Sequence, residues 1–260
     1  MNGGLVTLSV FLVPSLAGVV AGDLVEITGA EAHHAVAVRR LRTGESVALT
    51  DGRGREAVGS VRTTGRRLMQ VQVDFVTRHD EPTPAIWVVQ ALPKGDRGER
   101  AVEMLTEIGV ARIIPWAAER SVSQWRGERG DKALARWRST ARESTKQARR
   151  PWLAEVAPLL STAELLAMVG ASDLTVVLHE QAGGSLSEVS LPEVGTIVLV
   201  VGPEGGFSDA EVQSLSEAGG QLIGLGREVL RTSTAGVAAT AAVLSRTARW
   251  SAAGRPPRTT

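Results

Sequence analysis

The sequence has no cysteine and no tyrosine, and these absences exclude several kinds of protein. Without cysteine, the 260-residue chain forms neither a disulfide framework nor a thiolate metal site, and we expect a cytoplasmic location. Its four histidines supply few other ligands, so we also expect no metal ion. Aromatic residues make up only 3% of the chain, so side chains that could stack on nucleic-acid bases are scarce.

Long hydrophobic runs are also few, and the one near the N-terminus is typical of a strand. Leu5 to Ala21 is largely apolar, but Pro14 interrupts it and no Lys or Arg occurs before Arg39. A signal peptide begins with a positive region, and a membrane-spanning helix needs about 20 apolar residues. We therefore predict a buried strand at residues 6–13 and no membrane partner.

The net charge is only +1, but positive charge is concentrated in one predicted helix that begins at Asp131. Residues 120–150 contain ten Lys or Arg and three Asp or Glu. On a helical wheel the cationic side comprises Lys132, Arg136, Arg138, Arg142, Lys146, Arg149 and Arg150. A solvated helix surface accounts for such a face in many proteins. Here the mutual repulsion of the like charges favours contacts with phosphate groups.

The first 77 residues predict a small β-barrel. Short strands are expected between turn signals such as Asp51-Gly52 and Thr64-Gly65. They are Leu24–Thr28, Ser46–Thr50, Ala57–Val61 and Leu68–Phe75. Evenly spaced short strands are typical of a barrel. A second basic cluster lies here, formed by Arg39, Arg40, Arg42, Arg53, Arg55, Arg62, Arg66 and Arg67.

Residues 78–84 contain two prolines and several charges and predict a linker, after which the pattern becomes that of an α/β domain. The predicted strands are 86–91, 111–116, 174–179, 196–201 and 221–225. The predicted helices include 97–108, the basic helix and 162–169. Strands separated by helices imply a mainly parallel sheet that is covered on both faces. Trp116 and Trp137 are expected in its core.

Two stretches near the C-terminus repeat one arrangement, a strand followed by a small-residue loop and a helix start. Strand 196–201 leads into Gly202-Pro-Glu-Gly-Gly206, and strand 221–225 leads into Gly226-Arg-Glu-Val-Leu-Arg231. Glycines at the end of a strand let a ligand approach the backbone, and this edge is where open α/β sheets bind small molecules. Two such loops close together in the sequence predict a single pocket.

No common phosphate-binding or hydrolase motif accompanies these loops. The sequence lacks G-x-G-x-x-G after the first strand of a βαβ unit, G-x-x-x-x-G-K-[ST] and G-x-S-x-G. The loop after strand 196–201 suits a ligand that is recognised by backbone groups, such as an adenine, although a structural turn accounts for it equally well. Ser208 and Glu211 predict a capping box.

Adjacent polar residues are interpreted as structural. His179 and Glu180 would point to opposite faces of a strand, so we assign them to the wall of a loop and not to an acid–base pair. His33 and His34 are interpreted as a turn or a helix start, because too few other ligands are present for a metal site.

Several motifs, taken in order along the chain, resemble one family. They are His34-Ala-Val-Ala-Val-Arg-Arg-Leu-Arg42, Gln90-Ala-Leu-Pro-Lys94, Thr106-Glu-Ile-Gly-Val110, Pro115, Glu119-Arg-Ser-Val122, Glu143-Ser144, Gln147, Arg150, Leu178-His-Glu180, Val200-Val-Gly-Pro-Glu-Gly-Gly206 and Leu225-Gly-Arg-Glu-Val-Leu-Arg-Thr232. With them the sequence resembles the ribosomal RNA small subunit methyltransferase E family of the SPOUT superfamily. Members methylate N3 of a uridine in 16S rRNA.

The resemblance implies a fold and a methyl donor. It implies an N-terminal PUA-like β-barrel at 1–77, the linker, and a C-terminal SPOUT α/β domain at 85–260 that contains a deep trefoil knot. S-adenosylmethionine would lie among three loops of the knot. The implied cofactor-binding residues are Leu178, His179, Glu180, Leu199, Val201, Gly202, Pro203, Glu204, Gly205, Gly206, Leu225, Gly226, Leu230, Arg231 and Thr232.

The resemblance also implies a homodimer, with the active site near the subunit interface, that acts on 16S rRNA in the small ribosomal subunit. The expected RNA-binding residues are Arg39, Arg40, Arg42, Lys94, Arg120, Arg142, Lys146, Arg149 and Arg150. Two departures from the family pattern affect RNA contacts and proton handling. Val10 precedes Phe11 where members have Arg, and Ser233 stands where many have Glu.

Uridine N3 is a weakly acidic imide, so the reaction needs a base or a cation that favours its anion. Arg231 is the first candidate for stabilising this anion or a nearby phosphate, and a structural salt bridge is its alternative role. Glu204 is the second catalytic candidate because it could orient the base; its alternative role is to cap a backbone nitrogen. An RNA-binding assembly factor without methyl transfer, or an enzyme for another rRNA or tRNA nucleotide, remains the alternative function.

Overall fold

The computed structural model describes residues 8–251, and contacts divide the chain into two units. The first unit runs to Glu81 and also includes Thr145–Leu153. The second unit consists of Pro82–Ser144 and the residues from Ala154 onward. In the described range, no helix is both long enough and apolar enough to cross a membrane.

The first unit is built on a five-stranded sheet with the order β1-β3-β4-β5-β2. The strands are β1 (Ser9–Leu12), β2 (Leu24–Thr28), β3 (Ser46–Thr50), β4 (Arg55–Gly65) and β5 (Leu68–Arg78). Strand β1 is parallel to β3, and the other neighbours are antiparallel. Alternate residues of β4 and β5 are buried, because one face of the sheet covers a core around Phe11, Leu49 and Met69.

Each strand predicted for this unit forms, although β4 and β5 extend beyond their predicted ends. The strand expected at residues 6–13 is β1, and residues 6 and 7 lie outside the described range. Helix α1 (Gly29–His33) and the π-helix η1 (His34–Val38) follow β2. His33 is the last residue of α1 and His34 the first of η1, so the pair lies within a helical stretch and not at a turn. The centroid of the His34 ring is 6.4 Å from that of Phe11.

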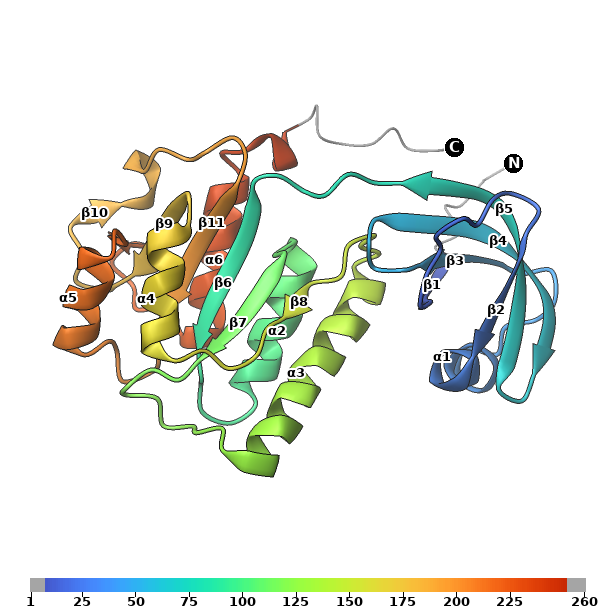
Figure 1. The fold of residues 1–260 in the computed structure, drawn as a ribbon, viewed down its shortest axis with the longest axis horizontal. Coiled ribbons are helices and arrows are strands. Elements are labelled where there is room, and N and C mark those ends of the chain that lie inside the picture. The colour runs from blue at the N-terminus through green and yellow to red at the C-terminus, as the bar shows by residue number, and fades with distance from the viewer. Residues whose placement is uncertain (1–7, 252–260) are drawn as a thin grey trace. The chain divides into compact units, whose positions relative to one another are not determined.

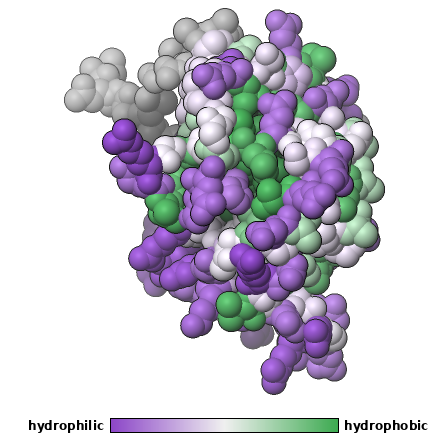
Figure 2. All heavy atoms as spheres, turned by 90° about the vertical axis from the view of Figure 1, so that its left-hand side faces the viewer, coloured by the Kyte–Doolittle hydropathy of each residue, from purple (hydrophilic) through white to green (hydrophobic). Residues whose placement is uncertain are grey.

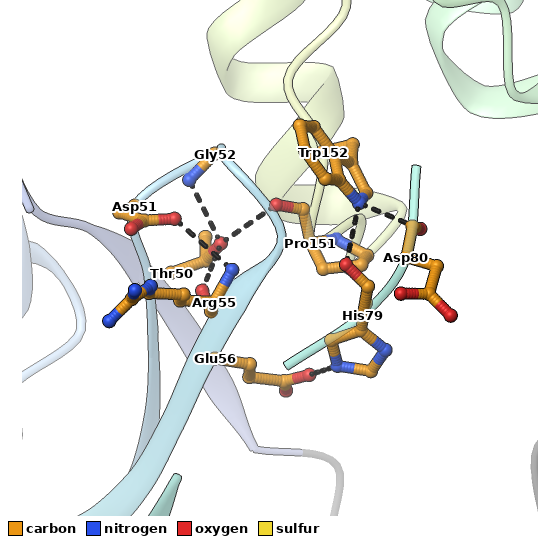
Figure 3. Close-up of polar contacts among 9 residues, drawn as sticks. All are labelled: Thr50, Asp51, Gly52, Arg55, Glu56, His79, Asp80, Pro151 and Trp152. Carbon is orange, nitrogen blue, oxygen red and sulfur yellow. Dashed lines mark hydrogen bonds and ion pairs between the residues drawn. The ribbon is translucent and has the colours of Figure 1, made fainter. Parts of the chain in front are cut away.

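Residues 145–153 are held on the first unit by a group of polar contacts (Figure 3). The indole N–H of Trp152 donates to the carbonyl oxygens of His79 at 3.2 Å and Asp80 at 3.0 Å. The His79 ring is in turn 3.1 Å from the carboxylate of Glu56 on β4. A segment far along the chain is thus fixed to the end of β5.

The second unit contains a seven-stranded, entirely parallel sheet with the order β10-β12-β9-β11-β6-β7-β8 (Figure 1). Its strands are β6 (Ala85–Ala91), β7 (Arg112–Trp116), β8 (Glu155–Val156), β9 (Leu174–Leu178), β10 (Gly184–Ser185), β11 (Thr196–Val201) and β12 (Gln221–Gly224). Its helices are α2 (Arg97–Ile108), α3 (Gly127–Gln147), α4 (Thr162–Ala171), α5 (Asp209–Glu217) and α6 (Thr232–Leu244), with 3-10 turns η2 (Leu186–Glu188) and η3 (Ala248–Trp250).

Helices cover both faces of this sheet because neighbouring residues of a strand point in opposite directions. Val88 and Leu199 belong to the core under α2, α3 and α6. Val89 and Val198 belong to the core under α4 and α5, on the other face (Figure 1). The three-layer α/β prediction is confirmed, and Trp116 and Trp137 are buried in it as expected.

The predicted elements of this unit form within a few residues of their expected bounds, but α3 begins at Gly127, before the expected Asp131. The sequence did not predict β8 or β10, because a two-residue strand has no measurable periodicity. The capping box of α5 is confirmed. The Ser208 hydroxyl accepts from the Glu211 amide at 3.3 Å, and the Glu211 carboxylate accepts from the Ser208 amide at 2.9 Å.

We predict that Gly54→Ala destabilises the first unit more than Gly44→Ala does. Both glycines have positive φ, +85° and +90°, so each substitution costs about 1–2 kcal/mol in backbone strain. At Gly54 a Cβ would also lie 2.5 Å from the Trp152 ring and 2.6 Å from the His79 carbonyl, whereas at Gly44 the space is open. We expect a total loss of roughly 3 kcal/mol for Gly54→Ala in urea unfolding. Equal losses would contradict this account of the Trp152 contact.

Candidate functional site

A cavity of about 490 Å³ lies at the carboxyl edge of the parallel sheet. Strands β9, β11 and β12 end side by side there, since Leu178 is in register with both Val201 and Ile223. The three loops that follow these strands supply most of its wall. The two glycine-bearing loops therefore line the same cavity, as their close spacing in the sequence predicted.

Every residue expected to bind a cofactor lines this cavity except Leu199. Leu199 is fully buried in the middle of β11 and belongs to the core under α2, α3 and α6, so it does not reach the cavity. Lining residues outside the loops expected to form the pocket include Arg97, Arg120, Gln181, Phe207 and Asp209. Arg97 follows β6, which is a neighbour of β11 in the sheet. Knowledge of this strand order would have placed Arg97 at the cavity.

The loop after β11 folds back over itself around Phe207. A Cβ on Gly202 would lie 2.7 Å from the Phe207 ring, so only glycine allows this ring to pack there. The amide of Gly206, whose φ is +71°, donates to the Pro203 carbonyl at 3.0 Å and closes the turn. The Phe207 ring also lies 5.8 Å from that of Trp116 and 6.0 Å from that of His179. The loop therefore rests on the core, with its glycines toward the cavity.

Glu204 binds two groups at the start of α2. Its carboxylate accepts a hydrogen bond from the Lys94 amide at 3.1 Å and one from the Arg97 guanidinium at 2.9 Å. Partial burial raises the pKa of Glu204, but hydrogen bonds from its own amide and that of Lys94, with the Arg97 guanidinium, bring its pKa below the ordinary 4.5. Glu204 is thus ionised at neutral pH. Its carboxylate already binds the Lys94 amide and the Arg97 guanidinium, which agrees with its alternative role of capping a backbone nitrogen.

Arg120 is also bound to the loop after β11. Its guanidinium donates to the Phe207 carbonyl at 2.9 Å, and its side chain lies against Gly205. The next residue back, Glu119, donates its amide to the carboxylate of Glu211 at 2.8 Å. The structure therefore places Arg120 in the cavity wall, where it fixes a loop, and its guanidinium is only partly available to RNA.

Arg231 is the N-cap of α6 and its side chain is exposed at the cavity. Its carbonyl accepts from the amides of Thr234 and Ala235 at 2.9 Å, which begins the helix. Within the described residues, no carboxylate pairs with its guanidinium, so the salt-bridge alternative is not observed. Val229 and Leu230, just before it, are 76% and 39% exposed. The cavity thus has one cation that is free to meet an anion.

His179 and Glu180 both line the cavity because β9 ends at Leu178, and the alternation of a strand no longer applies to them. The His179 Nδ1 accepts from the Gln181 amide at 3.2 Å. This geometry fits the loop-wall interpretation. In the range that the structure describes, no group of three or more histidine or acidic side chains is placed to hold a metal ion.

The remaining residues expected to contact RNA differ in availability. Lys146 lies in an ion pair with Glu31 at 3.0 Å, and its side chain is only 9% exposed. Arg39 donates to the Ser9 hydroxyl at 2.9 Å. Arg39 itself is exposed, as are Arg40, Arg42, Lys94, Arg142 and Arg149, whereas Arg150 is half-buried. On α3, Arg136 and Lys132 each lie 3.6 Å from a glutamate, so the helix is less free of acidic partners than its sequence indicated.

Comparison with known families matches both units. Residues 79–244 match the model of an RNA methyltransferase domain, and residues 27–74 match that of an RNA methyltransferase PUA domain. The chain is similar to ribosomal RNA small subunit methyltransferase E of Mycobacterium bovis, with 40% identity over 89% of this chain and 90% of that protein. The corresponding Bacillus subtilis protein is 32% identical, over 84% and 88% of the two chains.

Solved structures show the same resemblance. Ribosomal RNA small subunit methyltransferase E from Neisseria gonorrhoeae, bound to S-adenosyl methionine, superposes with a TM-score of 0.84 and 27% identity, over 93% of this chain and 98% of that chain. A Legionella pneumophila protein in complex with the bound cofactor SAM gives a TM-score of 0.85 and 26% identity, over 93% and 99% of the two chains.

We predict that Glu204→Gln lowers the free energy of unfolding at pH 7 and that the difference from the wild type disappears in acid. A carboxylate whose folded pKa is lowered stabilises the fold above its unfolded pKa and loses this effect as the pH falls through the folded value. Because the Arg97 pair is partly exposed, we expect a loss of up to about 1 kcal/mol at pH 7. The measurement is urea unfolding. Glu228→Gln is the control, because Glu228 lines the cavity but does not bind Lys94 or Arg97. A difference that stays constant from pH 7 down to pH values well below the ordinary carboxylate pKa would contradict the ionic role.

Proposed function

The chain belongs to the ribosomal RNA small subunit methyltransferase E family, and from this we propose that it transfers a methyl group from S-adenosylmethionine to N3 of a uridine in 16S rRNA. The observation that carries the proposal is the cavity at the carboxyl edge of the sheet, which gathers the three loops that the family resemblance implies. The first unit, as a PUA-like domain, would contribute RNA binding.

The residues of the cavity fit the methyl donor. Glycines 202, 205 and 206 leave backbone groups open to an adenine, and Val201, Leu225 and Leu230 offer apolar contacts. Glu180, Asp209 and Glu228 place carboxylates where a sulfonium cation would be favoured. When bound, the donor supplies an electrophilic methyl group. The residues expected from the sequence to hold it, apart from Leu199, remain our proposed cofactor site.

Arg231 is the proposed catalytic residue. The imide of uridine must lose its N3 proton before or during attack, and a nearby guanidinium stabilises the resulting anion. Arg231 is exposed at the cavity and no described carboxylate neutralises it. Glu204 is already engaged by Lys94 and Arg97, so we now propose it as a positioning residue that holds the donor loop.

RNA contacts are proposed for the exposed cations of each unit. Of the residues expected to bind RNA, those exposed in the first unit are Arg39, Arg40, Arg42 and Arg149. In the second unit Lys94 and Arg142 are exposed, and Arg120 reaches the donor cavity. Guanidinium and ammonium groups position an RNA backbone through its phosphates, without reading the sequence. The target uridine would then be selected at the cavity itself.

We also propose the knot and the dimer that the family resemblance implies. The knot is supported by the strand order, in which β11 lies between β9 and β6 while β12 returns to the far side of β9. The dimer is supported by exposed apolar surface. Val229 and Leu230 are exposed at the cavity, and Figure 2 shows apolar residues gathered in a band among hydrophilic ones, on the side of α5 and β10. Such surface often marks an interface.

Methylation of small ribosomal subunits from a strain that lacks the modification tests the function directly. We expect the purified protein and S-adenosylmethionine to produce 3-methyluridine in 16S rRNA, detected by mass spectrometry of nucleosides. A methyl group found on another nucleotide would instead support the alternative of an enzyme that modifies a different RNA position. Binding to the subunit without any methylated product would favour the assembly factor over the enzyme.

For Arg231→Ala we predict a kcat that is lower by roughly 100-fold or more, because the imide anion loses its stabilising cation. The dissociation constant for the donor, measured by calorimetry, should change little in comparison. Arg227→Ala removes an exposed cation from the same loop but not from the cavity, and should leave kcat near the wild-type value. Equal losses of kcat for the two substitutions would show that Arg231 contributes only to the overall positive charge of the loop, and would contradict its catalytic role.

A further inference from the structure

A second cavity, of about 320 Å³, lies in the same unit and is separated from the donor cavity by two chain segments. In the first segment, Arg97 lines the donor cavity while Gly95 and Gly98 line the second one. In the other, Arg120 lines the donor cavity while Gln124 and Trp125 line the second. The two cavities are therefore neighbours that share walls.

The shared walls are fixed by hydrogen bonds. The hydroxyl of Ser123 donates to the carbonyl of Pro93 at 2.7 Å, which ties the two segments to each other. The first segment is also tied to the donor loop through Glu204, and the second through the bond from Arg120 to Phe207. A group bound in the second cavity would thus lie at a set position relative to the donor loop.

The wall of the second cavity contains the indole N–H of Trp137. Trp137 is only 2% exposed, yet among the described residues no acceptor receives its indole N–H. A Cβ on Gly98 would lie 2.8 Å from this nitrogen, so only glycine at this position lets the indole pack against the first turn of α2. The nitrogen is not sealed from solvent, so an acceptor on a bound ligand would replace water as its partner.

The other wall residues suit a nucleotide. The half-buried Trp125 packs against Trp137, with ring centroids 4.9 Å apart and an interplanar angle of 80°. Gln124 is exposed and offers an amide that both donates and accepts. Arg129 is exposed, and no carboxylate in the described part of the chain pairs with it, whereas Arg136 is close to Glu99. The cavity therefore combines an aromatic surface, base-edge partners and one unneutralised cation.

We propose that this second cavity binds one nucleotide of the substrate RNA that neighbours the target uridine, with its base against Trp125 and within reach of the Trp137 N–H and Gln124. Arg129 contacts the phosphate of that nucleotide. The inference rests on the proposed function, since it assigns the cavity to the same RNA. A base held here would help to fix the register of the strand that enters the donor cavity.

Photocrosslinking tests the placement. The protein carries p-benzoylphenylalanine in place of Gln124 and is irradiated on unmethylated small subunits, and reverse transcription maps the modified nucleotide. We expect a crosslink at a nucleotide that directly flanks the methylated uridine. The same photoreactive residue in place of Arg126, which is exposed nearby but outside the cavity wall, is the control. Crosslinks from position 124 only to distant nucleotides would overturn the proposal.

Kinetics provide the second test. We expect Arg129→Ala to raise the KM for small subunits by about tenfold, with the donor dissociation constant unchanged, and Arg126→Ala to have a clearly smaller effect. Equal effects of the two substitutions, in a protein that methylates normally, would overturn the subsite and leave the proposed function intact. A wild-type protein that transfers no methyl group to these subunits would overturn both.

Discussion

The site depends on one constraint. Where both faces of a parallel sheet are covered by helices, polar side chains can gather around a ligand only at the ends of the strands. The strands of the second unit are nearly continuous apolar runs, because side chains of both orientations enter a core. Parallel register then places all of the carboxyl ends together, so the loops after β9, β11 and β12 meet around one cavity. The chemistry is carried by the loops, and the sheet sets their distances.

Those loops are held by contacts between segments that are far apart in the chain. Glu204 binds the start of α2, Arg120 binds the Phe207 carbonyl, and the Glu211 carboxylate, which caps α5, also accepts the Glu119 amide. Each of these contacts uses a charged group and a fixed direction, which restricts the loop more than apolar packing alone would. An ordered loop of this kind favours ligand binding, since less conformational entropy remains to be lost when the ligand arrives.

Sequence reasoning predicted the elements and most of the cavity, because both depend on local patterns. Apolar periodicity located the strands, and the glycine-bearing loops located the pocket residues that follow them. What it could not provide were partners. Arg97 and Glu204 are 107 positions apart, and Lys146 and Glu31 are 115 apart, so no local pattern shows that these charges neutralise one another. Leu199 was misplaced because a run of sequence assigned to a loop included the interior of its strand. The register of the sheet places Leu199 in the middle of β11, opposite Val176 of β9.

The anchoring of residues 145–153 to the first unit limits how modular this protein is. The turn after β3 finds a hydrogen-bond partner at Pro151, which is 101 residues after Thr50, and the end of β5 finds one at Trp152, which is 73 residues after His79. Closing so long a loop costs entropy that a contiguous domain would not lose in this way. A fragment that stopped at Glu81 would expose Gly54 and the carbonyls of His79 and Asp80 without these partners. Gene fusions or domain exchanges that transfer the N-terminal residues without residues 145–153 would therefore destabilise the first unit.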